Sequence, residues 1–495
     1  MADLKTVDLA TFCKQKGFIY PSSEIYGGVA GLYDYGHLGT KLKKNFEELW
    51  RKYFLGLDDN FFEIETANIM PENVFRASGH LENFIDPVAK CSQCEHYERA
   101  DHLVEVVVKK RVEELSSKEL TQLINKHKIR CPKCGAEFQP VTVLNMMFPL
   151  QMGVGAKNKA YLRPETAQSP YVNFKLQYEL LRKKLPLGLA LIGRAYRNEI
   201  SPRHLTLRQR EFTQAELQIF FNPKNLDQHP DFKTVKSYKL LTVLPADRKS
   251  DKTVERTAQE LAKAGLPQFY VYHLVKIQQF YLEQLKIPKE KFRLYQLNDQ
   301  EKAFYNQYHF DLEIKLNEQG WTEMGGLHYR TDHDLKGHQE ISKQSMEVIE
   351  EGDSEKFIPH VLELSFGVDR HVYALLELNR VNDQSRGNIV LKLSPKLAPY
   401  LGAVVPLVKN KEPVVKKAEE VYNIVKSGYS CYYDESGSVG RRYARADEVG
   451  VPFCITIDFE SLEDGCVTVR DRDTTKQERV KIKDLKDKLH YLYNK

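Results

Sequence analysis

An arginine-rich segment between two apolar runs, residues 193–216, most constrains how this chain of 495 residues can fold. Apolar residues flank the segment and Pro202 lies near its middle, which predicts a strand–turn–strand unit over about 185–221. Arginine is preferred where a planar fork must grip phosphate or carboxylate. The segment reads GRAYRNEISPRHLTLRQREFTQAE, and its arginines are Arg194, Arg197, Arg203, Arg208 and Arg210.

Strand alternation predicts which of these side chains lie together. Cations, a carboxylate and an aromatic ring on one face suit a nucleoside triphosphate, because arginines bind phosphates and a ring stacks on the base. A surface hairpin crossed by salt bridges is the alternative from the pattern alone. The pairs predicted to share a strand face are Arg197 with Glu199, Arg208 with Arg210, and Phe212 with Gln214.

A second candidate anion site lies in HVLELSFGVDRHVYALLEL, residues 360–378. The alternation predicts a strand that ends at Ser365 and a helix that starts near Val368. Backbone N–H groups at a helix start favour an anion. Arg370 in the first turn opposes the helix dipole, which favours acidic residues there. We therefore expect a negative ligand near Arg370; pairing with Asp369 or another neighbour is the alternative.

Three glutamates lie at the ends of apolar or strand-like runs: Glu165, Glu216 and Glu363. Burial of carboxylates there requires a cation, and the ammonium of a substrate is one candidate. Structural ion pairs are the alternative for each residue. The P-loop and dinucleotide-binding glycine motifs are absent from the sequence, so any ATP must be held by arginines on an antiparallel sheet.

Two cysteine pairs, each of the form Cys-x-x-Cys, lie within residues 86–145, which read as an insertion resembling a zinc ribbon. Four thiolates at such spacing suit tetrahedral zinc. Reduced free thiols or a degenerate relic of a metal site are the alternatives. The helix between the pairs is predicted to begin with a capping box of Ser116 and Glu119. The candidate ligands are Cys91, Cys94, Cys131 and Cys134.

The rest of the chain divides into a large unit, residues 1–393, and a C-terminal unit, residues 394–495. Residues 222–300 read as a second, mostly helical insertion, for example over Val254–Ala264. Strands that alternate with helices predict an α/β unit with a mixed sheet at the C-terminus. There, basic residues lie near tyrosines, a combination that suits unpaired RNA bases. These basic residues are Arg441, Arg442 and Arg445.

The charge balance excludes a polycation, because 73 Lys and Arg against 68 Asp and Glu leave a formal net charge of +5. A nucleic-acid site must then be a local patch. No apolar run approaches the roughly 20 residues needed to cross a bilayer. The N-terminus has no apolar signal core, so we expect a cytoplasmic protein that does not enter a membrane.

These motifs resemble the homodimeric class II glycyl-tRNA synthetases. RNEISPR with REFTQAELQIF resembles class II motif 2, and ELSFGVDR resembles motif 3. EIYGGVAGLYDYGHLG, FRASGHLENF, LRPETAQ and the C-terminal DESGSVGRRYARADEVGVPFCITIDF resemble glycyl-specific signatures. The resemblance covers nearly the whole chain apart from residues 222–300.

The resemblance implies an α+β fold: a class II antiparallel-sheet catalytic core with insertions, and a C-terminal α/β mixed-sheet domain that binds the anticodon. It implies a glycine–tRNA ligase that forms glycyl-adenylate from ATP and transfers glycine to the 3′ end of tRNA(Gly). It also implies a homodimer, and the reaction is expected to use magnesium. A pocket filled around the α-carbon of glycine excludes larger amino acids by size, so no editing domain is expected.

The resemblance assigns residues to the two substrates. Arg197 would bind the α-phosphate with Glu199 near the adenine, Phe212 would stack on the base, and Arg208 and Arg370 would bind the β- and γ-phosphates. The ATP set is Arg197, Asn198, Glu199, Leu207, Arg208, Gln209, Arg210, Glu211, Phe212, Glu323, Met324, Gly367, Val368, Asp369 and Arg370. The glycine set is Arg76, Glu165, Phe212, Thr213, Gln214, Ala215, Glu216, Arg330, Glu363, Leu364, Ser365, Phe366 and Gly367.

Arg197, Glu199 and Arg370 form the expected catalytic set, and Arg441, Arg442 and Arg445 the expected anticodon set. The chain departs from the family at Leu364, often Pro, at Tyr196, usually Phe, and at Gly326-Leu327-His328, usually Gly-Ile-Ala. The alternative function is a non-catalytic, synthetase-like accessory protein that binds nucleic acid. The presence of Arg197, Glu199, Phe212 and Arg370 argues against it, and the glycyl-type signatures argue against a ligase for another small amino acid.

Overall fold

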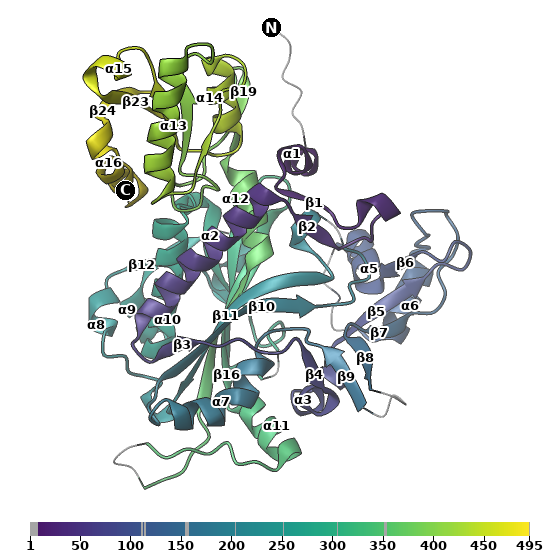
Figure 1. The fold of residues 1–495 in the computed structure, drawn as a ribbon. Coiled ribbons are helices and arrows are strands. Elements are labelled where there is room, and N and C mark those ends of the chain that lie inside the picture. The colour runs from purple at the N-terminus through teal and green to yellow at the C-terminus, as the bar shows by residue number, and fades with distance from the viewer. Residues whose placement is uncertain are drawn as a thin grey trace.

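The computed structural model describes residues 8–109, 112, 115–153, 158–202, 204–250, 252–303, 305–350 and 354–494. Figure 1 shows a central body built around one large sheet, with the C-terminal lobe (green to yellow) at one end. A smaller module, formed by residues near 85–145, projects from the side of the body in the same view.

A nine-stranded sheet forms the centre of the molecule. In spatial order its strands are β13 (Val254–Thr257), β12 (Lys239–Val243), β14 (Phe292–Gln296), β15 (Tyr308–Leu316), β16 (Gly320–Thr331), β17 (His360–Gly367), β11 (Glu211–Phe221), β10 (Leu187–Tyr196) and β3 (Phe61–Glu63). Neighbours are antiparallel, except that β3 is parallel to β10 and β14 is parallel to β12. The predicted hairpin over 185–221 is confirmed as β10 and β11.

The two faces of this sheet differ in polarity, as period-two alternation requires. On β11, Ala215, Leu217 and Ile219 face the main hydrophobic core. Helices α2 (His37–Phe54), α10 (Gln268–Gln279) and α12 (Val368–Asn379) pack in that core. The intervening Glu216 and Gln218 are buried and polar. The polar face of the central strands is therefore where the chemistry of the site can lie.

Helix α2 is amphipathic: it begins at His37 and buries Leu42, Phe46 and Trp50 on one face. Gly36 is the N-cap, and the Thr40 hydroxyl donates to the carbonyl of Tyr35. Glycine at position 39 permits close backbone packing, because a Cβ there would lie 1.9 Å from the Phe18 carbonyl oxygen.

The segment 222–300 is not mostly helical, which corrects the prediction. It supplies β12, β13 and β14 to the main sheet, and Val254–Thr257 is a strand rather than the start of a helix. The helical prediction is right for α9 (Ala258–Lys263) and α10. Short strands of four or five residues carry too little alternation to be distinguished from helical turns in a lysine-rich segment.

The projecting module contains a three-stranded sheet of β6 (Tyr97–Arg99), β5 (Ile85–Lys90) and β7 (Thr142–Asn145). Helices α5 (Ala100–Val108) and α6 (Ser117–Lys126) pack on a small hydrophobic core of the module's own. The predicted capping box of Ser116 and Glu119 is confirmed at the start of α6. A second small sheet joins the module to the body: β4 (Ile69–Pro71), β9 (Asn158–Leu162) and β8 (Phe148–Met152), with α3 (Glu72–Ala77) and α4 (His80–Asn83) beside it.

The C-terminal unit has the predicted mixed sheet and a separate core. Strand β20 is parallel to β21 and β22, whereas β23 and β24 run antiparallel. The elements are β20 (Gly402–Pro406), α13 (Glu412–Lys426), β21 (Cys431–Tyr433), α14 (Val439–Glu448), β22 (Phe453–Ile457), α15 (Ser461–Asp464), β23 (Cys466–Asp471), β24 (Gln477–Lys481) and α16 (Leu485–Asn494). Strand β24 and helices α15 and α16 were not predicted.

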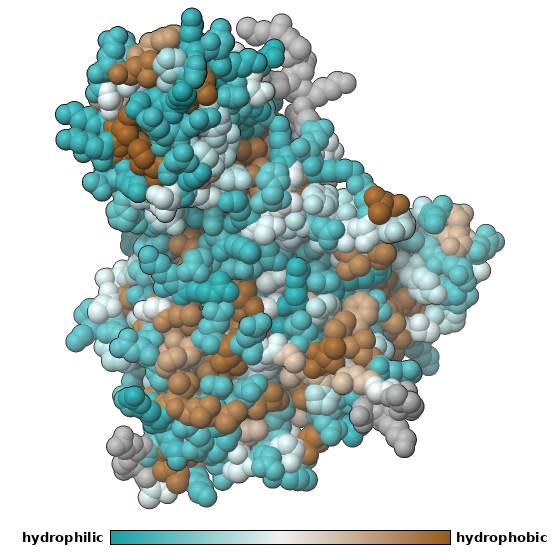
Figure 2. Space-filling model, in the orientation of Figure 1, coloured by the Kyte–Doolittle hydropathy of each residue, from teal (hydrophilic) through white to brown (hydrophobic). Residues whose placement is uncertain are grey.

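Figure 2 shows hydrophilic side chains over much of the C-terminal lobe, with apolar patches across the lower body. Within the described residues, no helix combines the length and the apolar character that crossing a bilayer requires.

Candidate functional site

A cavity of about 570 Å³ opens on the polar face of the main sheet, between the β10–β11 connection, β16 and the β17–α12 junction. It brings together most of the predicted ATP residues: Arg197, Glu199, Leu207, Arg208, Gln209, Phe212, Glu323, Met324, Gly367, Asp369 and Arg370.

Arg197 reaches this cavity from outside the strands, which corrects the predicted strand faces. Strand β10 ends at Tyr196 and β11 begins at Glu211, so Arg197, Glu199, Arg208 and Arg210 all lie in the connection. The connection folds back on itself, because the Arg197 N–H donates to the Arg210 carbonyl at 2.8 Å.

Aromatic rings hold the Arg197 side chain. Its guanidinium carbon lies 5.2 Å from the ring centre of Phe212 and 5.4 Å from that of Phe84. Arg197 Nε donates to the Pro164 carbonyl at 3.0 Å. Cation–π contacts and one hydrogen bond fix the guanidinium at the wall of the cavity before any ligand binds.

Arg370 lines the same cavity from the first turn of α12. Its Nη1 lies 3.2 Å from Glu323 Oε1, and its Nε donates to the Leu207 carbonyl at 3.2 Å. The alternative pairing with Asp369 is wrong, because Asp369 is buried and accepts from Lys43 Nζ, the Tyr35 hydroxyl and the Thr213 N–H. Two arginines 173 positions apart in the sequence therefore face one hollow.

One carboxylate oxygen of the cavity lacks a hydrogen bond. Glu199 Oε2 is buried and has no hydrogen-bond partner within the described part of the chain. Arg208 Nε is 3.8 Å from it, which is an ion pair without a hydrogen bond. A buried acceptor of this kind fits a ligand that carries an N–H donor.

Four residues of the predicted ATP set do not line the cavity. The Asn198 N–H donates to the Met146 carbonyl, and Val368 belongs to the hydrophobic core. Arg210 donates to the carbonyls of Glu199 and Ala30, and Glu211 pairs with Arg194. Arg203 lies outside the described residues. Thr206 and Gly325 line the cavity although the sequence did not single them out.

An acidic cluster adjoins the cavity on the same face. We define it as Glu165, Glu216, Glu363 and Asp334 together with Arg330. Arg330 Nε lies 2.8 Å from Asp334 Oδ2, and its Nη1 lies 3.2 Å from Glu363 Oε2. Glu216 Oε1 accepts from the Ser365 hydroxyl at 2.8 Å, and Ser365 itself lines the cavity.

The cluster holds more negative than positive charge, which perturbs its titration. Burial, together with Glu363 and Glu165, raises the pKa of Glu216 to about 8. Burial also raises the pKa of Glu363, partly offset by Arg330. Burial opposes ionisation of Glu165, but His80 and Arg330 lower its pKa below the ordinary value. Only Asp334 and Glu363 pair directly with Arg330, so the four carboxylates together could accommodate a further cation.

The predicted glycine set divides between two faces. Thr213, Gln214, Ser365 and Gly367 line the cavity with Phe212. Ala215, Leu364 and Phe366 point into the hydrophobic core on the other side of the sheet, so their side chains do not line the site. Arg76 pairs with Glu72 on α3, and its side chain is 52% exposed.

Two residues in or beside the acidic cluster, Asp334 and Tyr171, were not predicted from the sequence. Asp334 follows Arg330 by four positions, a spacing that could have signalled a pair. The Tyr171 hydroxyl, from α7 (Gln168–Leu180), donates to Glu363 at 3.0 Å and to Gln218 at 2.8 Å. No local sequence signal marks Tyr171, because its partners are distant in the chain.

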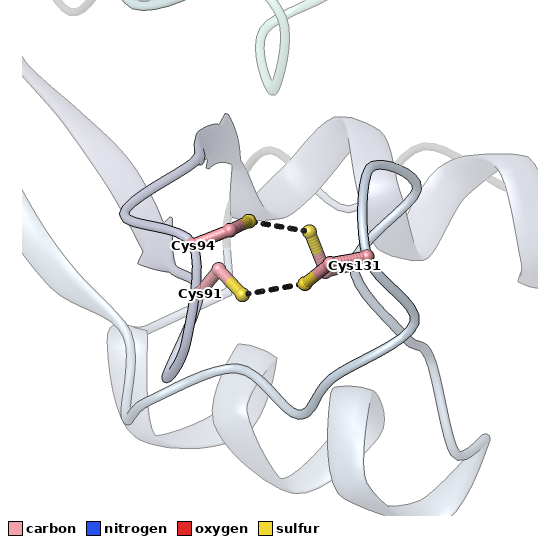
Figure 3. Close-up of side chains that lie close together, drawn as sticks. Cys91, Cys94 and Cys131 are labelled. Carbon is pink, nitrogen blue, oxygen red and sulfur yellow. Dashed lines mark hydrogen bonds between the residues drawn. The ribbon is translucent and has the colours of Figure 1, made fainter.

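The four predicted cysteine ligands converge in the projecting module. Their sulfurs all lie within 4.8 Å of one another. Figure 3 shows Cys91 and Cys94 on one loop and Cys131 on a facing loop. The sulfurs of Cys91 and Cys134 are 3.5 Å apart, and those of Cys94 and Cys131 are 3.6 Å apart. Tetrahedral zinc with bonds of about 2.3 Å places its sulfurs about 3.8 Å apart. The Gln93 N–H donates to Cys91 Sγ, a contact that stabilises a thiolate.

Relatives of known name resemble the whole chain. The glycine–tRNA ligase of Pyrococcus furiosus is 40% identical, with 98% of each chain covered. That of Methanothermobacter thermautotrophicus is 37% identical, covering 96% of this chain and 97% of its own. The chain belongs to the glycine–tRNA ligase family. In keeping with this family, the model of the "tRNA synthetase class II core domain (G, H, P, S and T)" matches residues 151–243, and that of the "Anticodon binding domain" matches residues 403–491.

Solved structures show the same fold at low identity. A threonyl-tRNA synthetase structure from Cryptosporidium parvum aligns with a TM-score of 0.61 at 16% identity and covers 98% of both chains. A prolyl-tRNA synthetase from the same organism aligns with a TM-score of 0.59 at 13% identity and covers 98% of this chain and 75% of its own. The class II fold predicted from the sequence is therefore confirmed for this glycine–tRNA ligase family member.

The predicted anticodon arginines differ in their surroundings. Arg442 is buried, and it donates to the carbonyls of Pro406, Glu435 and Gly437. Its prediction as an RNA contact is wrong, because its guanidinium is used inside the domain. Arg445 pairs with Asp434 at 2.6 Å and keeps a 43% exposed side chain, and Arg441 is exposed. In this family member, Arg441 and Arg445 remain candidates for tRNA contact.

Proposed function

We propose that this protein activates glycine with ATP and transfers the glycyl group to the 3′ end of tRNA(Gly). The observation that carries the proposal is the position of the arginine-lined cavity directly beside the acidic cluster. An ATP molecule needs cations for its phosphates, and free glycine brings an ammonium that the excess carboxylates would neutralise.

The proposed ATP site uses the cavity residues in the roles that the resemblance implies. Arg197 binds the α-phosphate, and Arg208 and Arg370 bind the β- and γ-phosphates. Phe212 stacks on the adenine, and the unpartnered oxygen of Glu199 accepts from its amino group. Glu323 offers a carboxylate beside Arg370, the ligand type that magnesium prefers. Magnesium bound there would neutralise phosphate charge.

The first reaction is an in-line displacement. A glycine carboxylate oxygen bonds to the α-phosphorus of ATP, the bond from that phosphorus to the β-bridging oxygen breaks, and pyrophosphate leaves. Neither reactant loses a proton, so the chain needs no general base for this step. Its contribution is positioning and stabilisation of the phosphoryl oxygens, chiefly by Arg197.

The acidic cluster orients glycine for this attack. With the ammonium among Glu216, Glu165 and Glu363, the carboxylate points toward Arg197 and the α-phosphate. In the second reaction the terminal ribose hydroxyl of tRNA attacks the carbonyl carbon of glycyl-adenylate. The bond between that carbon and the phosphate oxygen breaks, and AMP leaves; its phosphate oxygen keeps the electron pair and takes up the proton of the ribose hydroxyl. The C-terminal domain supplies the anticodon contact, for which Arg441 and Arg445 are the candidates.

The remaining proposals concern the assembly. We propose that Cys91, Cys94, Cys131 and Cys134 hold structural zinc, which would fix the module without entering the reaction. We further propose a homodimer in the cytoplasm, as the resemblance implies. Light scattering of the purified protein at several concentrations tests the dimer, and a constant mass near 57 kDa contradicts it.

The test of the proposed function is ATP–pyrophosphate exchange across a panel of amino acids. We expect exchange with glycine and none with alanine, serine or threonine. Exchange with serine or threonine but not with glycine would point to a ligase for another amino acid. No exchange with any amino acid, in a protein that binds tRNA, would point to a non-catalytic accessory protein.

A further inference from the structure

One side chain of the projecting module holds the β10–β11 connection and has no role in the proposed chemistry. Glu98 lies on β6, and its Oε2 accepts a hydrogen bond from the Ser201 hydroxyl at 2.9 Å. Ser201 lies two positions after Glu199, which lines the cavity. A bond between residues 103 positions apart in the sequence therefore ties the module to the wall of the proposed ATP site.

The connection also contacts the base of the module at two earlier positions. The guanidinium of Arg197 lies over the ring of Phe84, just before β5. The Asn198 N–H donates to the carbonyl of Met146, just after β7, at 2.7 Å. These contacts and the bond of Ser201 follow one another along the first part of the connection. The module therefore supports the segment that carries the two main ATP-binding side chains of the connection.

The position of Glu98 depends on a turn that contains two of the candidate metal ligands. Cys91 and Cys94 lie in the turn between β5 and β6, and Glu98 pairs with Ala89 across that hairpin. The Cys91 N–H donates to the His96 carbonyl at 2.8 Å and closes the turn. His96 Nε2 lies 3.0 Å from Glu98 Oε1, so the turn holds the carboxylate as well as the backbone. A continuous set of contacts thus runs from the cysteines to Ser201.

A metal ion would fix this turn from its other side. Cys131 and Cys134 lie on a separate loop, and their sulfurs face those of the turn. A metal bound by all four sulfurs would join the two segments and restrain the strand that carries Glu98. The cysteines lie outside the cavity, so the metal would influence ATP through the protein, and the bond from Glu98 to Ser201 is a direct route between β6 and the connection.

We infer that Glu98 and Ser201 are positioning residues for ATP, and that they couple the cysteine site of the projecting module to the cavity. This inference rests on the proposed function, and it gives the module a part in ATP binding. Most of the acidic cluster lies on β11, β16 and β17, so the same bond should matter little for glycine.

The first test compares two Michaelis constants in glycine-dependent ATP–pyrophosphate exchange. Ser201→Ala should raise the KM for ATP by about 3- to 10-fold, as the loss of one hydrogen bond implies, and leave the KM for glycine unchanged. Ser201→Thr keeps the hydroxyl and should restore the KM for ATP. A general loss of stability would lower the amount of active protein, and hence kcat, without separating the two KM values.

Two more variants show whether the effect belongs to this bond. Glu98→Ala should raise the KM for ATP by a similar factor, and Glu98→Ala/Ser201→Ala should raise it no further, because both substitutions remove one interaction. Ser385 donates to Asp383 at 2.6 Å in an exposed turn, and Ser385→Ala is the matched control that should leave both KM values unchanged. Effects of Glu98→Ala and Ser201→Ala that multiply in the double variant would overturn the inference.

The coupling to the cysteine site is tested by ATP binding rather than by activity. Isothermal titration calorimetry with ATP and magnesium is carried out before and after the protein is dialysed against a chelator, and again after zinc is returned. Chelation should weaken ATP binding to wild type by about the factor seen for Ser201→Ala, zinc should restore it, and chelation should have no further effect on Ser201→Ala. Equal weakening in both proteins, or none in wild type, would overturn the coupling.

The results separate this inference from the proposed function. Wild type without glycine-dependent exchange overturns the proposed function. Wild type with exchange, combined with an unchanged KM for ATP in Ser201→Ala and Glu98→Ala, overturns only the role of the Glu98–Ser201 bond. If Ser201→Ala fails to fold while Ser385→Ala folds, Glu98→Ala decides in its place.

Discussion

The raised pKa of Glu216 makes a quantitative prediction about stability. The folded protein holds a proton on Glu216 up to about pH 8, whereas the ordinary value for glutamate is 4.5. The contribution of Glu216 to the free energy of unfolding therefore falls as the pH rises from 4.5 to 8, because the unfolded chain releases this proton first. At about 1.4 kcal/mol per pH unit, the loss is at most about 5 kcal/mol, of which about 2 to 3 kcal/mol falls between pH 6 and pH 8.

Glu216→Gln removes this titration and keeps an oxygen that can accept from Ser365. We expect the free energy of unfolding of the variant to exceed that of wild type by a margin that grows by about 2 to 3 kcal/mol from pH 6 to pH 8. Urea unfolding followed by circular dichroism at pH 6, 7 and 8 measures the margin. The exposed Glu179 on α7 provides the control, and Glu179→Gln should follow wild type across this range.

Glycine provides a second measurement of the same group. An ammonium beside Glu216 favours its ionised form, so the stabilisation of wild type by saturating glycine should increase from pH 6 to pH 8. The Gln variant should lack this increase. Parallel pH curves for wild type and Glu216→Gln, with or without glycine, would refute the assignment of a raised pKa and with it the electrostatic account of the amino-acid site.

Three further predictions follow from single contacts. Arg197→Ala should abolish ATP–pyrophosphate exchange while tRNA binding persists, and near-normal exchange would show that Arg197 does not bind the α-phosphate. Arg442→Ala should lower the stability of the C-terminal unit by about 2 to 4 kcal/mol in thermal unfolding, because buried carbonyls lose their donor. Arg441→Ala should leave stability unchanged and weaken tRNA binding. Equal melting temperatures for the two variants would contradict this prediction. The purified protein should carry about one zinc per chain, and chelation should make residues 86–145 sensitive to protease; less than half an equivalent of zinc would count against the site.

Much of the site could be predicted from local sequence because its chemistry is concentrated in short motifs. The arginines of the β10–β11 connection and Arg370 at a helix start both indicated an anion, and the structure places Arg197 and Arg370 on one cavity. The members of each cysteine pair, and Ser116 and Glu119 of the capping box, are three positions apart in the sequence. Such local spacings could be recognised without knowledge of the tertiary structure.

What could not be predicted depends on partners distant in the chain. The sequence predicts Arg442 to be an exposed arginine that binds RNA. In the structure its guanidinium instead donates to the carbonyls of Pro406, Glu435 and Gly437. Asp369 reads as a partner for Arg370, but Lys43 from α2 takes it instead. Strand β12 joins the edge of the main sheet because β14 offers it a pairing edge, and β13 then pairs with β12. The sequence of residues 239–257 does not contain the distant strand β14.

The most direct test of the account is a crystal structure with a non-hydrolysable analogue of glycyl-adenylate. We predict that its ammonium lies within about 3 Å of Glu216 and at hydrogen-bonding distance of a second carboxylate of the acidic cluster. The group that replaces the phosphate should contact Arg197, and the adenine should lie against Phe212. An analogue bound with its ammonium outside the acidic cluster, or with Arg197 turned away from it, would contradict the central claim.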